Sequence, residues 1–188
     1  AIRDVYKRQG QHRSGKLALL EELLSTILAE GEKALIFTQY KEFGEYLSDY
    51  VRKRFGVPAP FLHGSLRREE RDAMVDSFQS PDGPPIMVLS LKAGGTGLTL
   101  TAANHVIHYD RWWNPAVENQ ATDRAYRIGQ TKDVQVRKLV CDGTIEERID
   151  DIISHKSTMS DLVVSTGETW LTELDDEQLQ ELFRLEVT

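Results

Sequence analysis

Five short apolar runs constrain the fold of this chain more than any other feature. They lie at residues 34–38, 59–63, 86–90, 105–109 and 134–140. Most of them are apolar at consecutive positions, which is typical of strands that are buried on both faces. Helical patterns at 41–55, 67–79 and 115–127 separate the runs. Strands that alternate with helices in this way predict an α/β fold, in which helices cover both faces of a mostly parallel sheet.

The two ends of the chain differ from this central pattern. A helix is expected from a Ser14 cap to a Gly31 stop, with apolar residues at three-and-four spacing between them. Residues 1–13 have no period that joins this helix, and we treat them as a disordered leader or a boundary artefact. The main domain is then 14–164, with a final helix that begins near Thr144, and residues 165–188 form an acidic helical tail.

Charge and cysteine content leave the choice of partner open. The formal charge is −7, and the segment from Ser165 to Thr188 holds seven acids and one base, so the remainder carries −7 − (−6) = −1. A near-neutral body can still present a local basic surface, so the total does not exclude nucleic acid. The single cysteine, Cys141, excludes an internal disulfide and a multi-thiolate zinc site. No apolar run approaches the roughly 18 residues that span a bilayer, so no membrane partner is expected.

The N-terminal segment G-Q-H-R-S-G-K, residues 10–16, has the spacing of a phosphate-binding P-loop up to its lysine. A P-loop needs Ser or Thr next, to bind magnesium, and a buried strand before it. Here the next residue is Leu17, and the preceding segment is polar. We therefore interpret this segment as the start of a helix.

Two arginines stand at the centre of the segment Q-A-T-D-R-A-Y-R-I-G-Q, residues 120–130. Arg124 and Arg127 are three apart near the end of the helix expected from Pro115, so both guanidiniums can face one anion such as a triphosphate. The alternative is a solvated helix face on which Asp123 pairs with Arg127, and for two arginines alone that alternative is favoured.

A glycine-rich loop, L-S-L-K-A-G-G-T-G-L-T-L-T, follows the third apolar run at residues 89–101. Such a loop after a buried strand exposes backbone N–H groups that can bind phosphate. Ser90 and Lys92 at its entrance could donate to a second phosphate, for example in a nucleic acid backbone. A simple tight turn remains the alternative.

Together the two segments resemble helicase motifs V and VI of the Swi/Snf-related, DNA-dependent ATPases. Four further segments are similar to that family: A-L-I-F-T-Q-Y at 34–40, F-L-H-G-S-L-R-R-E-E-R at 61–71, W-W-N-P at 112–115 and T-I-E-E-R at 144–148. The resemblance covers about Ser14 to Leu185. It implies a RecA-like three-layer domain of the P-loop NTPase class, the second of two helicase lobes, with a helical C-terminal extension.

The resemblance also implies roles for individual residues. Arg124 and Arg127 would be arginine fingers that act on ATP, and Gly95, Gly97 and Gln120 would line the ATP cleft. Residues expected at the DNA backbone are Thr38, Gln39, His63, Gly64, Ser90, Lys92 and Trp113. For Trp113, core packing is an alternative of nearly equal weight.

Cofactor and partners follow from the same resemblance. ATP with magnesium would be held mainly by an N-terminal RecA-like lobe, because this sequence has neither a complete P-loop nor a D-E-x-H segment. The expected partners are that lobe, double-stranded DNA and a protein complex. The chain alone is predicted not to hydrolyse ATP.

The sequence departs from the family pattern at Thr99, where many relatives have Asn, and at Arg111, where Pro, Asp or Ser is more usual. The tail at 169–185 resembles that of bacterial members, which favours a bacterial cytoplasm with nucleoid DNA; a eukaryotic protein would be nuclear. Two rivals stay open: a non-catalytic DNA- or protein-binding module with the same fold, and a strand-separating helicase. His105 and His108 are three apart in an expected strand, so they should point to opposite faces, and we assign no metal site to them.

Overall fold

A computed structural model describes residues 15–91, 98–110, 115–123, 125, 133–141 and 146 of the chain. The elements in these ranges are α2 (Gly15–Ala29), β1 (Ala34–Thr38), α3 (Lys41–Phe55), β2 (Phe61–Leu62), α4 (Arg68–Gln79), β3 (Ile86–Ser90), β4 (His105–His108), α5 (Pro115–Thr122) and β5 (Gln135–Lys138). The predicted leader, the Ser14 cap and the acidic tail lie outside the described residues.

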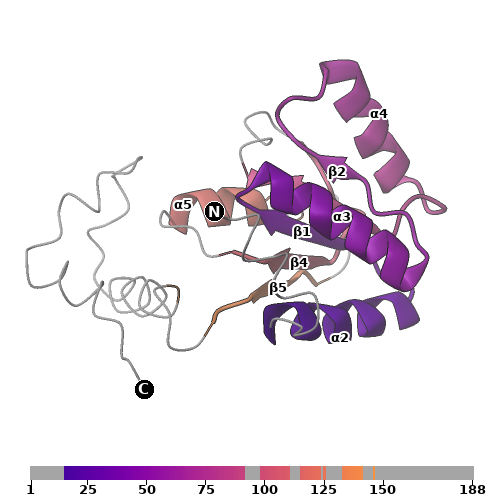
Figure 1. Cartoon of the computed structure of the whole chain (residues 1–188). Helices are drawn as coiled ribbons and strands as arrows, with labels where there is room; N and C mark the ends of the chain where they lie inside the picture. The colour runs from indigo at the N-terminus through magenta and orange to yellow at the C-terminus, as the bar shows by residue number, and fades with distance from the viewer. Residues whose placement is uncertain are drawn as a thin grey trace, which may run out of the picture.

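The five strands form one sheet in the order β2-β3-β1-β4-β5, and every neighbouring pair is parallel (Figure 1). β1 is central: Ala34 pairs with Ile86 on one side and with His105 on the other. The predicted α/β class with a mostly parallel sheet is therefore confirmed.

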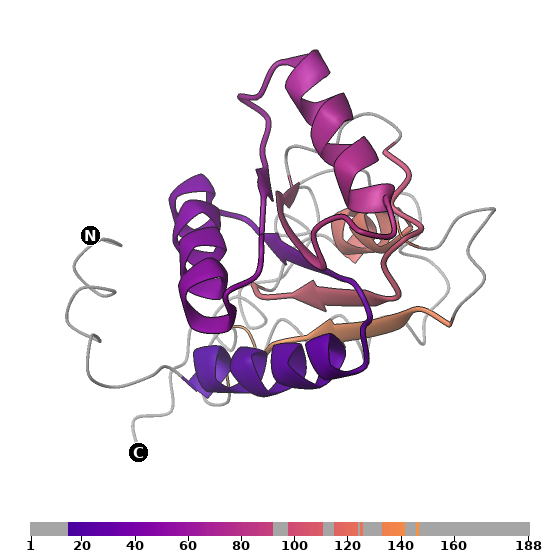
Figure 2. The same cartoon turned by 90° about the vertical axis from the view of Figure 1, so that its right-hand side faces the viewer.

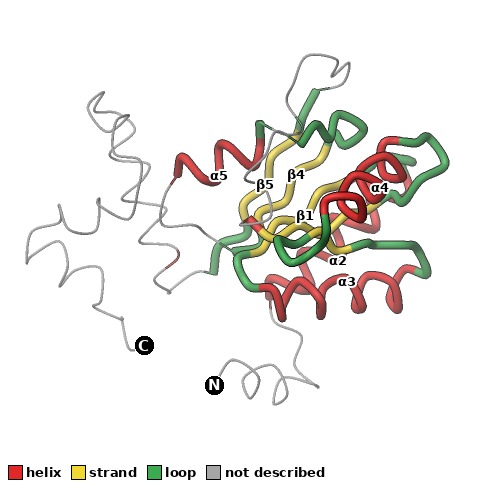
Figure 3. Tube along the Cα trace, turned by 90° about the horizontal axis from the view of Figure 1, so that it is seen from above, coloured by secondary structure: helices red, strands yellow, loops and turns green. Residues whose placement is uncertain are grey.

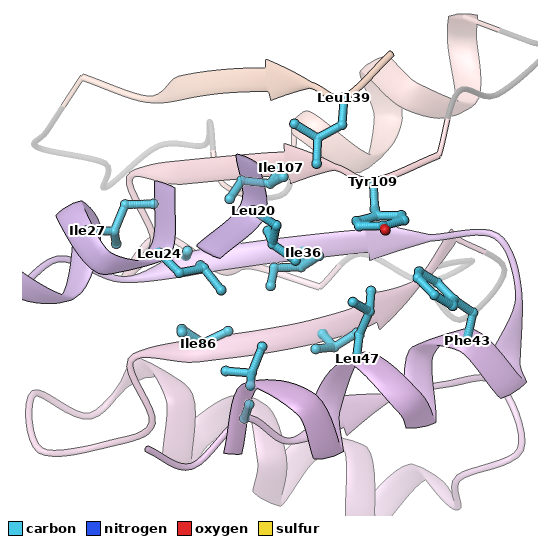
Figure 4. Close-up of a cluster of buried hydrophobic side chains, with 14 residues drawn as sticks. Leu20, Leu24, Ile27, Ile36, Phe43, Leu47, Ile86, Ile107, Tyr109 and Leu139 are labelled. Carbon is cyan, nitrogen blue, oxygen red and sulfur yellow. The ribbon is translucent and has the colours of Figure 1, made fainter. Parts of the chain in front are cut away.

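Helices cover both faces of the sheet, which gives three layers (Figures 2 and 3). On one face α2 and α3 pack against alternate strand residues, among them Ile36, Val88 and Ile107 (Figure 4). On the other face Phe78 of α4 and Ala121 of α5 join the core formed by the intervening strand residues. Consecutive residues of β1, β3 and β4 are buried because each strand faces two helical layers.

Glycines end the first two described helices. Gly31 (φ 67°) follows α2, and Gly56 (φ 68°) caps α3 with its N–H bonded to the Arg52 carbonyl at 3.0 Å. Both adopt the left-handed conformation, which costs glycine least. The predicted stop at Gly31 is confirmed.

The edge strands are shorter than predicted. β2 covers Phe61–Leu62 rather than 59–63, and β5 covers Gln135–Lys138 rather than 134–140. Each edge strand has a single neighbour, and Pro60 has no N–H to extend the ladder, although its carbonyl accepts from the Val88 N–H at 2.9 Å. The side chains of β5 are mostly exposed, so this edge departs from the expected full burial.

Among the described helices, none combines the length and the apolar character needed to cross a membrane.

Candidate functional site

The carboxyl ends of the parallel strands meet along one edge of the sheet. Thr38 ends β1, Ser90 ends β3, His63 follows β2 directly and Asp110 follows β4 after one intervening residue. In open α/β sheets this edge is where ligands bind. Thr38, His63 and Ser90, which were predicted from three separate motifs, therefore lie along the edge where ligands bind in this class of fold.

Asp110 connects the ends of the two central strands. Its Oδ2 accepts a hydrogen bond from the Thr38 hydroxyl at 2.6 Å and one from the Gln39 N–H at 3.1 Å. Burial raises the pKa of the Asp110 carboxyl, while these hydrogen bonds and the Lys16 charge lower it and the Glu146 charge raises it. The network holds the end of β1 against the end of β4.

Lys16 supplies a cation behind this network. Its ammonium donates to the Tyr109 carbonyl at 2.9 Å and to the Glu146 carboxylate at 2.7 Å, and its side chain is 9% exposed. The second oxygen of Glu146 accepts from the Cys141 N–H at 3.2 Å. The lysine of the apparent P-loop thus lies in α2 and forms a partly buried ion pair, which agrees with our rejection of a P-loop.

The sequence analysis assigned no role to Lys16, Asp110 or Glu146. Asp110 directly follows the apolar run at 105–109. An acidic residue directly after an expected strand is a sequence signal that could have indicated its place at the site. The Lys16–Glu146 pair had no local signal, because 130 positions separate the two residues.

Three of the predicted DNA-facing residues differ in exposure. Thr38 is fully buried and Ser90 is 7% exposed, whereas Gln39 is half-buried. The side chain of Thr38 contacts Asp110 instead of the surface, so any contribution of Thr38 to binding runs through that carboxylate. Lys92, Gly95 and Gly97 lie outside the described residues.

His63 and Gly64 lie at the end of β2. Gly64 is exposed and His63 is half-buried, with its ring 5.0 Å from that of Phe61. Among described residues, none forms a hydrogen bond with the buried Nδ1 of His63. Burial lowers the pKa of His63 and the Lys41 charge lowers it further, against smaller opposite effects of Glu45 and Glu70. In a neutral imidazole one ring nitrogen donates and the other accepts a hydrogen bond.

Helix α5 leads into the predicted arginine pair. Gln120 on α5 is exposed, while Arg124, Arg127 and Trp113 lie outside the described residues. The helix ends at Thr122, earlier than predicted, and the Ala125 N–H bonds to the Thr122 carbonyl three residues back at 3.0 Å. This tighter pattern is typical of a helix end, and residues three apart share a side in it as they do in an α-helix. The predicted common side for Arg124 and Arg127 lies outside the described residues.

The two histidines of β4 point to opposite faces, as predicted. Nε2 of His108 lies 3.0 Å from the Thr122 hydroxyl, whereas His105 contacts Arg137 and Glu32. Arg137 donates to Nδ1 of His105 at 2.9 Å, so Nε2 carries the proton and donates to Glu32.

Glu30, Glu32 and His105 bring possible metal ligands within 4.8 Å of one another. A metal at Nε2 of His105 would have to displace the proton that the Arg137 contact places there. The arrangement is better explained as a hydrogen-bond network at the amino ends of β1 and β4.

Magnesium binding needs free carboxylate oxygens and water positions. The carboxylate of Asp110 accepts from Thr38 and Gln39 and lies close to the charge of Lys16. The Oδ2 oxygen of Asp110 is therefore occupied by two donors, which does not favour this oxygen as a magnesium ligand.

Comparison with known proteins identifies the family. A family model described as the helicase conserved C-terminal domain matches residues 15–129, more than half of the chain. YwqA of Bacillus subtilis, named for a proposed ATP-dependent helicase/translocase activity, is 56% identical over 94% of this chain and 19% of its own length. The human chromatin-remodeling ATPase INO80 is 41% identical over 91% of this chain and 12% of its own length. The chain thus spans a fifth or less of these relatives.

Solved structures agree with the sequence matches. The Sulfolobus solfataricus SWI2/SNF2 ATPase core in complex with dsDNA has a TM-score of 0.78 and 43% identity, and covers 95% of this chain and 37% of that one. The C-terminal domain of the same ATPase has a TM-score of 0.74 and 40% identity, and covers 95% of this chain and 72% of that one. The strand order, the helical layers and these matches together show that the chain belongs to the helicase conserved C-terminal domain family, as a RecA-like lobe of the Swi/Snf-related ATPases.

Proposed function

We propose that this chain is the second lobe of an ATP-driven motor that moves along double-stranded DNA. The observation that carries the proposal is the gathering of Gln39, His63 and Ser90, from three strand ends, along the ligand-binding edge of the sheet. Two relatives support it: the similar Sulfolobus core was solved with dsDNA, and YwqA is named as a helicase/translocase.

ATP with magnesium is proposed to be held mainly by an N-terminal lobe, with this chain contributing from the other side of the cleft. Arg124 and Arg127 would neutralise the charge that develops on the phosphates during transfer. An arginine finger is worth roughly 10³ to 10⁵ in rate. Gly95, Gly97 and the exposed Gln120 would line the same cleft. Without that other lobe, the chain is expected to be inactive.

The DNA backbone is proposed to pass along the carboxyl edge. The Gly64 backbone and the His63 ring would donate to phosphate oxygens, with Gln39, Ser90, Lys92 and Trp113 beside them. Because its pKa is lowered, His63 would act as a neutral donor rather than a cation. Thr38 would act indirectly, by holding Asp110. These contacts are expected to be independent of sequence, since they involve the backbone.

Substitution of Arg127 in the full-length protein tests the proposal. Arg127→Ala is expected to lower DNA-stimulated ATP hydrolysis by roughly 10³-fold, with DNA affinity retained. Arg52→Ala is the matched control, because Arg52 is an exposed arginine on α3 that pairs with Asp49. A wild-type protein that binds DNA but hydrolyses no ATP in its presence would favour the binding-module alternative.

Translocation and strand separation need a separate comparison. We expect the full-length protein to displace the third strand of a triplex and to leave a forked duplex paired. Fork unwinding would instead support the strand-separating helicase. A bacterial cytoplasmic location with nucleoid DNA remains part of the proposal, based on the resemblance of the tail.

A further inference from the structure

One face of α5 is buried against the sheet. Ala121 on α5 is 3% exposed, Ala125 three residues after the end of α5 is fully buried, and both belong to the core on that side. Small side chains of this kind fill space but allow a helix to rotate or slide. Hydrogen bonds or ion pairs, which depend on direction, are needed to fix the position of α5.

Two polar contacts provide that direction. The Glu118 carboxylate accepts from the Lys138 ammonium at 2.9 Å, with side-chain exposures of 1% and 36%. Four residues later, the Thr122 hydroxyl lies 3.0 Å from Nε2 of His108. A buried carboxylate is costly unless it is paired, so Glu118 strongly favours the rotation that reaches Lys138.

Both contacts reach the same level of the sheet. His108 of β4 and Lys138 of β5 are register partners in the parallel ladder. The helix is therefore fastened to two adjacent strands at one position, by groups that lie one helical turn apart on α5. Such an arrangement restricts both the rotation of α5 and its movement along its axis.

From this geometry we propose that Glu118 and Thr122 are positioning residues for the arginine pair. Arg124 stands in the sequence between Asp123, whose N–H bonds to the Asn119 carbonyl at 2.8 Å, and the buried Ala125. Fixing α5 therefore fixes the described residues that flank Arg124 in the sequence. The inference rests on the proposed function, because it concerns how the arginines are aimed at ATP.

Steady-state ATP hydrolysis by the full-length protein with dsDNA tests the inference. Glu118→Gln and Thr122→Val are each expected to lower kcat by roughly 10- to 100-fold, because displacement by about 1 Å has that effect on a catalytic group. The KM for ATP and the DNA affinity should change little. Thermal unfolding of each variant establishes that assays are run well below its midpoint.

A double-variant cycle separates the ion pair from general packing. Lys138→Met removes the ammonium that contacts the buried Glu118 carboxylate and should reduce kcat more than Glu118→Gln does. Glu118→Gln with Lys138→Met should recover part of that loss, because the buried charge is removed. Asp49→Asn, which removes one carboxylate from an exposed pair on α3, serves as the matched control with wild-type kcat.

The outcomes distinguish this inference from the proposed function. If Arg127→Ala abolishes hydrolysis while Glu118→Gln, Thr122→Val and Lys138→Met all keep wild-type kcat, the positioning role is wrong and the motor function stands. If Arg127→Ala has no effect on hydrolysis, the proposed function fails first. A parallel loss of kcat and DNA affinity in the α5 variants would also overturn the inference, because it would indicate general unfolding.

Discussion

Two lysines, Lys16 and Lys33, lie at opposite ends of the parallel strands and are held by different groups. Lys16 is at the carboxyl ends and Lys33 is at the amino ends. Lys33, before β1, donates to the carbonyls of Phe78 at 2.8 Å, Ser80 at 2.5 Å and Gly83 at 3.4 Å. All three acceptors are neutral and belong to the end of α4 and the turn behind it. Burial lowers the pKa of Lys33, which the Asp82 charge partly opposes.

Lys16, at the carboxyl edge, is held by groups that are remote from one another in the sequence. Its partners are the Tyr109 carbonyl and the Glu146 carboxylate, and the Asp110 carboxyl lies close enough to respond to its charge. Lys33 therefore joins the start of β1 to a single turn 45 to 50 residues further along the chain, whereas Lys16 contacts two separate segments where we propose that DNA is bound. Neutral carbonyl groups hold Lys33 at the end of α4, whereas Lys16 also has a carboxylate partner.

The largest effect is expected from Lys16→Met. It breaks the partly buried Lys16–Glu146 ion pair, and breaking such a pair costs about 3 kcal/mol of unfolding free energy. Urea denaturation of the purified chain measures the loss. Adding Glu146→Gln should restore part of it, since the carboxylate charge is then removed. Wild-type stability of Lys16→Met would show that the pair contributes nothing.

A smaller loss is expected from Lys33→Met. Three carbonyls lose their donor, but water reaches part of this turn, so the cost should be about 1 to 2 kcal/mol. Lys33→Arg keeps the charge and should lie between the wild type and Lys33→Met in the same denaturation experiment. If Lys33→Met lowered the free energy of unfolding as much as Lys16→Met does, the proposed difference between the contacts of the two lysines would be wrong.

The smallest effect is a change in pH dependence for Asp110→Asn. Because the folded state raises the pKa of Asp110, the native protein binds more protons at this site than the unfolded chain does, and the site's contribution to stability falls as pH rises between the two values. Asn cannot titrate, so the variant should gain stability relative to the wild type across this window. Urea midpoints measured from acid to neutral pH test the sign, with Asp49→Asn as an exposed control. A relative gain as pH falls would contradict it.

Sequence patterns predicted the central elements better than the edges. The bounds of β1, β3 and α3 match the predicted 34–38, 86–90 and 41–55. Lys33 and Gln39 bound the apolar run of β1, two prolines precede the run of β3, and Gly56 ends the helix. β2 and β5 are shorter because the length of an edge strand depends on its one neighbour and, at Pro60, on a missing N–H.

Individual residues of the candidate site could be predicted only where they belong to a sequence motif of the family. His63, Gly64 and Gln39 do lie along the carboxyl edge, but the burial of Thr38 follows from its hydrogen bond to Asp110, which no local pattern reports. The Lys16–Glu146 pair forms only in the folded chain, because 130 positions separate the two residues. Interactions between remote charged residues need the fold before they can be recognised.

The strand order has a consequence for how the chain reaches its native state. Ala34 of β1 pairs with Ile86 and with His105, so neither neighbour of the central strand exists until much of the domain has been synthesised. Pairing across such sequence separations is slow compared with local helix formation. A nascent chain that ends before Ile86 carries the apolar β1 with no strand beside it. We therefore expect stalled or truncated products to aggregate, and chaperone engagement to fall once β4 has left the ribosome.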